Sequence, residues 1–297
     1  MDPITLRSGP LAVVLLPWVG GSIARFWSET AGGAVELLRP APAESLLRRD
    51  PSSMASFPLV PWSNRIREGR FAFGGRVVAL APNDPPERHA IHGHGWGAAW
   101  TVVDASPAAA VLEYRHHPDA WPWAYRAVQR VALSPADLAL ELRLTNESDG
   151  PMPAGLGWHP YFPRAAGTTL TARVGRLWLT DAEVMPLTLV APAPEQDPGR
   201  GLPVDRVALD NVFTGWDGQA LVDWPERRAR LTIATGPPLG CLVVYSPPGR
   251  SFFCVEPVSH VTDAFNLAAA GRTDTGTMTL APGETVGAGV RFTPEVA

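Results

Sequence analysis

The strongest local pattern in this chain of 297 residues is an alternation of apolar and small or polar side chains. In the segment 138–145, LALELRLT, every second residue is leucine. A period of two is typical of a β-strand with one face in a core. No window of helical length carries a sustained apolar stripe with a period of 3.6 residues. The sequence therefore favours an antiparallel, strand-built fold over a parallel β/α architecture.

Turn residues divide the rest of the chain into short segments. There are 28 glycines and 32 prolines, and Gly74-Gly75 separates the apolar segments 70–73 and 76–80 in the manner of a β-hairpin. Further strands are expected at 111–114, 231–234, 242–245, 252–255 and 290–292. Short helices fit 43–49 and 263–269, and the proline-rich segment 191–203 is predicted to be a surface loop. We expect one all-β domain, a large sandwich covering residues 1–297.

The uncharged segment 8–24 is the one stretch that resembles a targeting signal. It is too short to span a membrane. Pro17 and Gly20-Gly21 interrupt it, so a strand, a turn and a second strand explain it better. The prediction is a cytoplasmic protein without a membrane partner.

Charge and cysteine content exclude several function classes. The net charge is −4, with no basic run that would neutralise a phosphate backbone, so nucleic acid is not an expected partner. The basic residues are all arginine, which excludes a Schiff-base lysine mechanism. Cys241 and Cys254 do not resemble a zinc ligand set and are predicted to be reduced core residues.

Four short segments concentrate reactive and aromatic residues in this apolar chain. They are NR at 64–65, IHGHGW at 91–96, GWHPYF at 157–162 and VEP at 255–257. Aromatic faces beside a few convergent polar groups are typical of a carbohydrate cleft. Because the segments lie far apart in the sequence, only the fold can unite them.

Together these segments resemble the aldose 1-epimerase (galactose mutarotase) family. The matching pieces occur in the family's order and extend over residues 5–293. They are NRI at 64–66, HG at 92–93 ahead of Trp100, HPYF at 159–162, LDNVF at 209–213, and VEP at 255–257 followed by DAFN at 263–266.

The resemblance implies a galactose mutarotase-like β-supersandwich that interconverts the α and β anomers of a free aldose. It implies no metal and no organic cofactor, a small sugar as the partner, and a monomer or homodimer. By the same resemblance Glu256 is the general base and His159 the general acid. Sugar-contacting residues are expected at Arg65, His92, Asp210, Asn64, Tyr161 and Trp158.

The chemistry explains these residue types. Mutarotation removes the proton of the C1 hydroxyl while the ring oxygen is protonated, which a carboxylate and an imidazolium can do. We therefore expect an ionised Glu256 and an at least partly protonated His159 near neutral pH. Glu256 follows the apolar run FFCV, where a buried carboxylate needs a functional reason.

The sequence also departs from the family pattern near these motifs. His94 replaces a glycine that often follows the His-Gly pair, and Val258-Ser259-His260 replaces the usual residues after Glu-Pro. Hexose-6-phosphate epimerases commonly have an arginine where Ala98-Ala99 precedes Trp100, although Arg67 or Arg70 could supply charge. His94, Trp96 and Trp158 are expected behind the sugar-contacting residues or at the rim of the site, without a catalytic role. His89, His116, His117 and His260 are expected to have no catalytic role.

Three other functions stay open on this evidence. One is a sugar-binding or sensing protein without catalysis, and another is a hexose-6-phosphate 1-epimerase. The third is a glycoside hydrolase, which would need two carboxylates such as Asp210 and Glu256.

Overall fold

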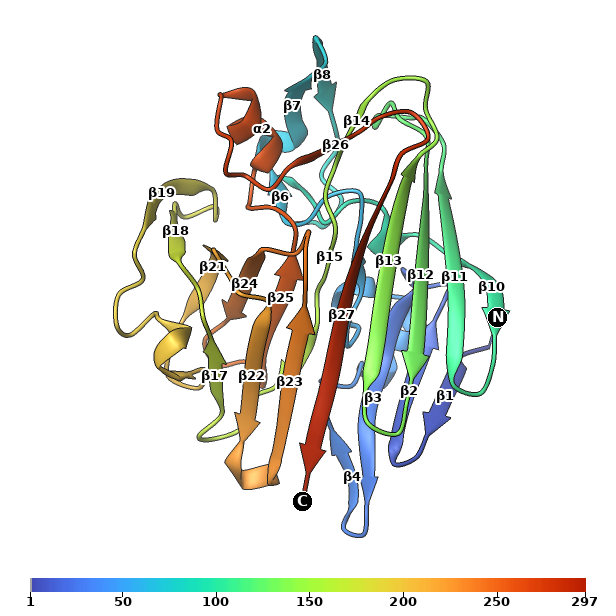
Figure 1. The fold of residues 1–297 in the computed structure, drawn as a ribbon, viewed down its shortest axis with the longest axis vertical. Helices are drawn as coiled ribbons and strands as arrows, with labels where there is room; N and C mark the ends of the chain where they lie inside the picture. The colour runs from blue at the N-terminus through green and yellow to red at the C-terminus, as the bar shows by residue number, and fades with distance from the viewer. Residues whose placement is uncertain (1) are drawn as a thin grey trace.

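The structure, a computed structural model, describes residues 2–297. A nine-stranded antiparallel sheet forms its front layer (Figure 1). In order across the sheet, its strands are β10 (Thr101–Ala105), β11 (Ala109–His116), β12 (Tyr125–Leu133), β13 (Leu138–Asn146), β27 (Thr285–Val296), β23 (Ala229–Thr235), β22 (Gln219–Trp224), β17 (Thr169–Ala172) and β20 (Leu202–Pro203).

A second, eight-stranded antiparallel sheet carries one wall of the candidate site. Its strands in order are β19 (Pro186–Val190), β18 (Arg176–Thr180), β21 (Leu209–Thr214), β24 (Cys241–Ser246), β25 (Phe252–Val258), β15 (Gly157–Trp158) and β5 (Pro58–Leu59), with β16 (Tyr161–Pro163) also paired to β25. The smaller sheets are β1 (Ile4–Ser8), β2 (Leu11–Leu16), β3 (Ser22–Thr30) and β4 (Gly33–Glu36); β6 (Arg65–Ile66) with β9 (Ala90–Ile91); β7 (Arg70–Phe73) with β8 (Arg76–Ala79); and β14 (Met152–Ala154) with β26 (Met278–Leu280).

The two large sheets pack face to face around a shared aromatic core. Phe162 of β16 and Phe253 of β25 lie 5.6 Å apart between ring centroids, and Phe162 lies 6.5 Å from Phe292 of β27. These three rings are fully buried, and they join the eight-stranded sheet to the nine-stranded one. The predicted all-β sandwich is confirmed.

The alternation in 138–145 has the expected structural cause. On β13 the four leucines are buried and the residues between them are half-buried or exposed. The strand pairs with β12 on one side and β27 on the other, so its leucine face is continued by both neighbours. Each fully buried leucine contributes about 1.5–3 kcal/mol relative to an exposed one.

Short helices and turns occur where the sequence places them. The helices α1 (Ala43–Arg48) and α2 (Ala264–Ala269) fall within the two predicted segments, and β7 and β8 pair as a hairpin across Gly74-Gly75. The segment 191–203 is irregular apart from the 3-10 turn Pro198–Arg200 and the two residues of β20. Further 3-10 turns are Pro51–Ser53, Arg67–Gly69, Gly95–Gly97 and Pro225–Arg227.

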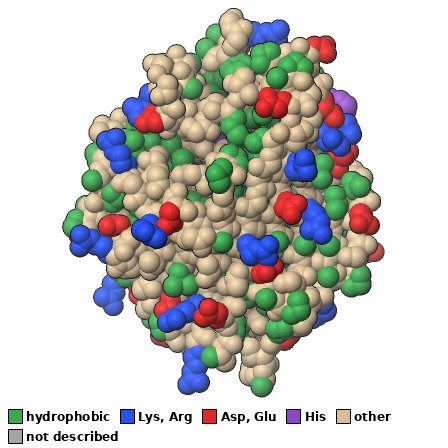
Figure 2. Space-filling model, viewed as in Figure 1, with side chains coloured by type: hydrophobic (Ala, Val, Ile, Leu, Met, Phe, Trp, Pro, Cys, Tyr) green, Lys and Arg blue, Asp and Glu red, His purple; other side chains and the backbone are tan. Residues whose placement is uncertain are grey.

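The segment 8–24 folds as predicted into a strand, a turn and a second strand, β2 and β3, which pair with each other. Among residues 2–297, no helix has the length and apolar character needed to cross a membrane. Cys241 and Cys254 are buried and free, as expected. Figure 2 shows arginine and acidic side chains interspersed on the outer face of the nine-stranded sheet, where Arg291 pairs with Asp137 at 2.7 Å.

Candidate active site

The alternation of side chains along β25 puts Glu256 on the outer face of the eight-stranded sheet. Phe253 and Val255 point into the core between the sheets, so Cys254 and Glu256 face the other way. Strand pairing then selects the partner of Glu256. Gly157 lies opposite Val258 and Tyr161 lies opposite Cys254. His159, midway between the two paired positions, therefore falls opposite Glu256.

The same register adds a second row of side chains next to this pair. Tyr245 lies opposite Cys254, and Asp210 lies opposite Tyr245 on the next strand. Loops from the first third of the chain close the other side and leave a cavity of about 190 Å³. This is below the roughly 300–1,000 Å³ of pockets for drug-sized ligands, and it suits one sugar ring. The cavity is lined by Ser52, Phe57, Asn64, Arg65, Asp84, Ile91, His92, Trp96, His159, Tyr161, Asp210, Val243, Tyr245 and Glu256.

Two residues with left-handed backbones, Asn64 and His92, hold each other in place. Their φ angles are 55° and 62°. The backbone N–H of Asn64 donates to Nδ1 of His92 at 3.1 Å, and the N–H of His92 donates to the Asn64 carbonyl at 3.0 Å. Because Nδ1 accepts, a neutral His92 carries its proton on Nε2 and can donate it to a sugar hydroxyl. Burial, followed by the charges of His159 and Arg65, lowers the pKa of His92 well below its ordinary value.

Gly93 explains the His-Gly motif in physical terms. Its φ is +75°, and a Cβ at this position would lie 2.0 Å from the carbonyl oxygen of Val60. Only glycine fits a backbone that passes so close to another and has this φ. The turn fixes the direction in which His92 enters the cavity.

The two proposed proton-transfer residues are buried and adjacent. Nε2 of His159 lies 3.3 Å from Oε1 of Glu256. The imidazole is held between two aromatic rings, with centroids 4.8 Å from Phe57 and 4.6 Å from Tyr161. Among the protein groups of residues 2–297, Oε2 of Glu256 has no hydrogen-bond partner. A buried carboxylate oxygen without a partner is costly, and a ligand hydroxyl would satisfy it.

The protonation states differ from the sequence expectation of an ion pair. Burial raises the pKa of Glu256 well above its ordinary value and lowers the pKa of His159 to about 3. Both directions favour a neutral acid beside a neutral imidazole. That state holds one proton, as the expected ion pair does, so the two forms differ only in which residue carries the proton.

Arg65 is oriented by three neighbours at the mouth of the cavity. Its Nε donates to Glu87 at 2.7 Å, its backbone N–H donates to Asn64 Oδ1 at 2.8 Å, and its Nη2 lies 3.9 Å from Asp210 Oδ2. Burial raises the pKa of Asp210, and the Arg65 charge opposes that rise. The guanidinium fork is thus fixed and largely neutralised, and it remains able to donate to vicinal hydroxyls.

The comparison with known families agrees with this geometry. The family model described as aldose 1-epimerase matches residues 2–293 of the chain. The chain belongs to the aldose 1-epimerase family.

Similarity to Escherichia coli K12 proteins extends over nearly the whole chain in both comparisons. The uncharacterized protein YphB is 32% identical over 273 residues, which cover 89% of each chain. A solved structure described as a candidate aldose 1-epimerase superposes with a TM-score of 0.90 at 30% identity, covering all of this chain and 99% of the other. A galactose mutarotase-like protein from Clostridium acetobutylicum shares the fold, with a TM-score of 0.86, 20% identity, and coverage of 99% and 95%.

Within this aldose 1-epimerase fold, one residue expected at the site lies elsewhere. Trp158 is fully buried in the core, and its indole N–H donates to Gln129 at 3.2 Å. The alternation of β15 turns Trp158 away from the face that carries His159, so it does not line the cavity. The other residues that the sequence proposed do line it.

Some lining residues had no sequence signal that identified them. Phe57 and Asp84 lie in irregular segments, and Tyr245 lies in a predicted strand whose pairing with Asp210 could not be read from the sequence. Trp96, expected at the rim, packs 5.4 Å from Phe57 and 5.9 Å from His92. His260 is a core histidine: its Nε2 accepts from the Ser63 backbone at 3.1 Å.

Proposed function

We propose that the protein is a mutarotase that interconverts the α and β anomers of a free aldose by acid–base ring opening and closure. The observation that carries the proposal is the buried Glu256–His159 pair, 3.3 Å apart on one wall of a cavity sized for a sugar ring. Fixed donors and acceptors for hydroxyl groups surround the pair, and burial shifts the pKa of each partner as is typical of catalytic groups.

The single proton shared by Glu256 and His159 is sufficient for both ring opening and ring closure. With the shared proton on His159, the Glu256 carboxylate takes the proton of O1–H and Nε2 of His159 gives its proton to O5. The C1–O5 bond breaks and C1 becomes a carbonyl. Glu256 is then protonated and His159 is neutral, which is the state that burial favours.

Closure returns both protons. After rotation about C1–C2, His159 removes the proton from O5–H as O5 attacks the other face of the carbonyl. Glu256 returns its proton to O1, and the pair regains its starting form. Each of the two proton transfers typically contributes about 10²–10⁴ in rate.

The charges of the cavity favour a neutral sugar over a sugar phosphate. Among the described residues that line it, Arg65 carries the single permanent positive charge, and Glu87 and Asp210 already neutralise it. Asp84 adds a further carboxyl group to the lining. A phosphate dianion would meet net negative charge here, so we infer that the substrate is an uncharged aldose.

Polarimetry tests this function directly. Freshly dissolved α-D-glucose and α-D-galactose should approach their unchanged final rotations faster with protein than without it. Glu256→Gln should reduce the rate by about 10²–10⁴ and leave sugar binding largely intact. Glu226→Gln is the control for loss of a glutamate, because Glu226 is exposed in the 3-10 turn Pro225–Arg227 and does not line the cavity.

Sugar-binding and aryl glycoside assays, run beside polarimetry, separate the alternatives. A sugar-binding protein would bind the aldose without accelerating its mutarotation. A glycoside hydrolase would release sugar from an aryl glycoside. Equal loss of binding and rate in Glu256→Gln would indicate a structural glutamate and contradict the proposed roles.

A further inference from the structure

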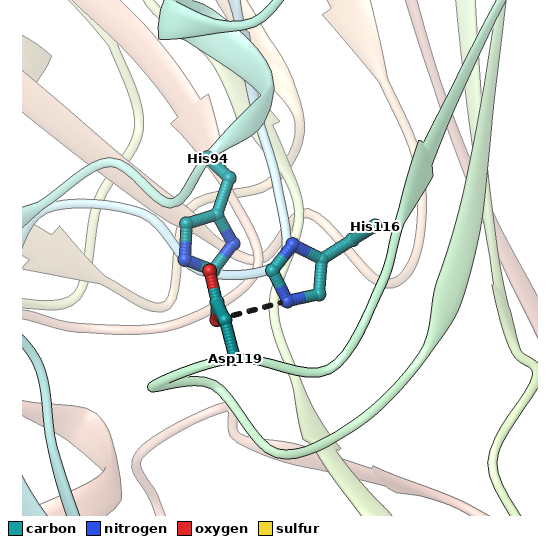
Figure 3. A group of neighbouring side chains, drawn as sticks. All are labelled: His94, His116 and Asp119. Atoms are coloured by element: carbon teal, nitrogen blue, oxygen red, sulfur yellow. Dashed lines mark ion pairs between the residues drawn. The ribbon is translucent and has the colours of Figure 1, made fainter.

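A second group of potential ligand side chains lies outside the sugar cavity, where the loop after β9 meets the turn between β11 and β12 (Figure 3). It consists of His94 from the loop, His116 at the end of β11, and Asp119 in the turn. One donor atom from each residue lies within 4.8 Å of the other two, and Nε2 of His116 is 3.3 Å from Oδ1 of Asp119. None of the three residues lines the cavity that contains His159 and Glu256.

A tyrosine hydroxyl engages the Nδ1 atom of each imidazole. Nδ1 of His94 lies 3.1 Å from the hydroxyl of Tyr125, and Nδ1 of His116 lies 3.4 Å from that of Tyr114. When Nδ1 carries the proton and donates it to the hydroxyl, Nε2 keeps a lone pair. This is the outer-shell arrangement that orients metal-binding histidines.

The surroundings are apolar on one side and open to solvent on the other. The ring of Trp62 packs 5.1 Å from His94, and His116 is buried. The side chain of Asp119, in contrast, is 62% exposed.

We propose that His94, His116 and Asp119 bind a divalent transition-metal ion of the zinc class. Two imidazoles and one carboxylate form a donor set that suits Zn²⁺, and the exposed side of the site gives room for a water as fourth ligand. The 3.3 Å between His116 and Asp119 is the separation expected for two ligands of one ion at about 2.0–2.1 Å.

Binding requires one ring to turn. The two imidazoles now lie parallel, with an interplanar angle of 5° and centroids 4.4 Å apart, so their in-plane lone pairs do not converge. The torsion about Cβ–Cγ of histidine is broad, so either ring can tilt toward Asp119 by a change in this one torsion, which also loosens the contact of its Nδ1 with the tyrosine hydroxyl. His116 Nε2 must also release its present contact with the Trp121 carbonyl, at 3.2 Å, for the metal.

The ion would fasten two segments that no strand pairing joins. His94 follows Gly93 and His92, so the metal would hold the cavity-forming loop against the β11–β12 turn. The inference concerns binding and stability, and it does not depend on the proposed mutarotase activity.

Cobalt and zinc titrations of protein stripped with a chelator test the site. Co²⁺ should produce the visible absorption of a bound, four-coordinate ion with one equivalent per chain, and Zn²⁺ should displace it. Zn²⁺ should also raise the Tm. Asp119→Asn, at an exposed position that should tolerate the change, and His116→Gln should each weaken binding at least tenfold.

Two controls locate the ion. His117→Gln removes the neighbouring exposed histidine and should bind Co²⁺ like the wild type. Glu256→Gln should also keep the binding, which excludes the other possible ligand group, His159, Cys254 and Glu256. Absence of Co²⁺ binding, or binding that Asp119→Asn and His116→Gln leave unchanged, would overturn the proposal.

Discussion

His159, in the link between β15 and β16, lies opposite Glu256 of β25, with Nε2 and Oε1 3.3 Å apart in a buried site. Their separation is set by strand pairing, so the pair is preorganised before a sugar binds. Because burial disfavours charge on either partner, the pair keeps a single shared proton over a wide pH range.

The first prediction concerns the pH dependence of the reaction. The pKa of His159 is lowered to about 3 from an ordinary 6.5, so a second proton joins the pair only in strong acid. The kcat/KM for mutarotation should therefore stay nearly constant from about pH 7 down to about pH 5. Polarimetry at each pH, corrected for the uncatalysed rate, measures it. An acid limb centred near pH 6.5 would contradict the shared-proton description.

A second prediction concerns stability. The folded pKa of Glu256 lies above the unfolded value of 4.5, so between the two values the folded protein binds more protons than the unfolded chain. The free energy of unfolding must then fall as the pH rises, by up to about 1.4 kcal/mol per pH unit from this group. Glu256→Gln has no carboxyl group at this position, so its free energy of unfolding does not fall with pH for this reason. The Tm of Glu256→Gln minus the Tm of the wild type should therefore increase from pH 5 to pH 8.

Thermal melts at several pH values measure that difference. His159 contributes in the opposite direction at low pH in both proteins, so its effect largely cancels in the comparison. Glu226→Gln serves as the control, with a Tm difference that should not vary with pH in this way. A constant difference for Glu256→Gln would mean that the carboxyl group is not buried in solution.

Much of the fold was predictable because its signals are local. The leucine alternation of β13, the glycine pair between β7 and β8, and the breaks in the segment 8–24 each act over a few residues. Of the eight site residues proposed from the family resemblance, seven line the cavity.

The features that the sequence did not predict depend on strand pairing and on the burial of side chains. Trp158 adjoins His159 in the sequence, but neighbours on a strand point to opposite faces, so Trp158 lies in the core and does not line the cavity. The position of the shared proton depends in the same way on burial: desolvation raises the pKa of Glu256 and lowers that of His159, and no motif reports desolvation. His94 and His116 lie 22 positions apart, and only the fold stacks their rings.

A third prediction concerns selectivity against phosphate. Glu87 holds Arg65 at 2.7 Å and cancels most of its charge. Glu87→Gln should therefore improve kcat/KM for glucose 6-phosphate relative to glucose by about tenfold, the equivalent of one screened charge interaction of roughly 1.4 kcal/mol. Coupled assays on both sugars measure the ratio, with Glu226→Gln as a control for net charge. An unchanged ratio would show that Arg65 does not face the part of the sugar that bears phosphate.

The last prediction separates backbone geometry from side-chain chemistry in the loop that carries His92. In Gly93→Ala, the new Cβ would lie 2.0 Å from the Val60 carbonyl oxygen at a φ of +75°, so the loop must shift. We expect a loss of several kcal/mol in the free energy of unfolding and a higher KM for the sugar, because His92 moves with its neighbour. Gly97→Ala is the matched control, since nothing lies within 4 Å of its Cβ position. Denaturant unfolding and steady-state kinetics measure the free energy of unfolding and the KM of both variants. Equal values for the two variants would mean that the close approach of Gly93 to Val60 does not hold the loop in place.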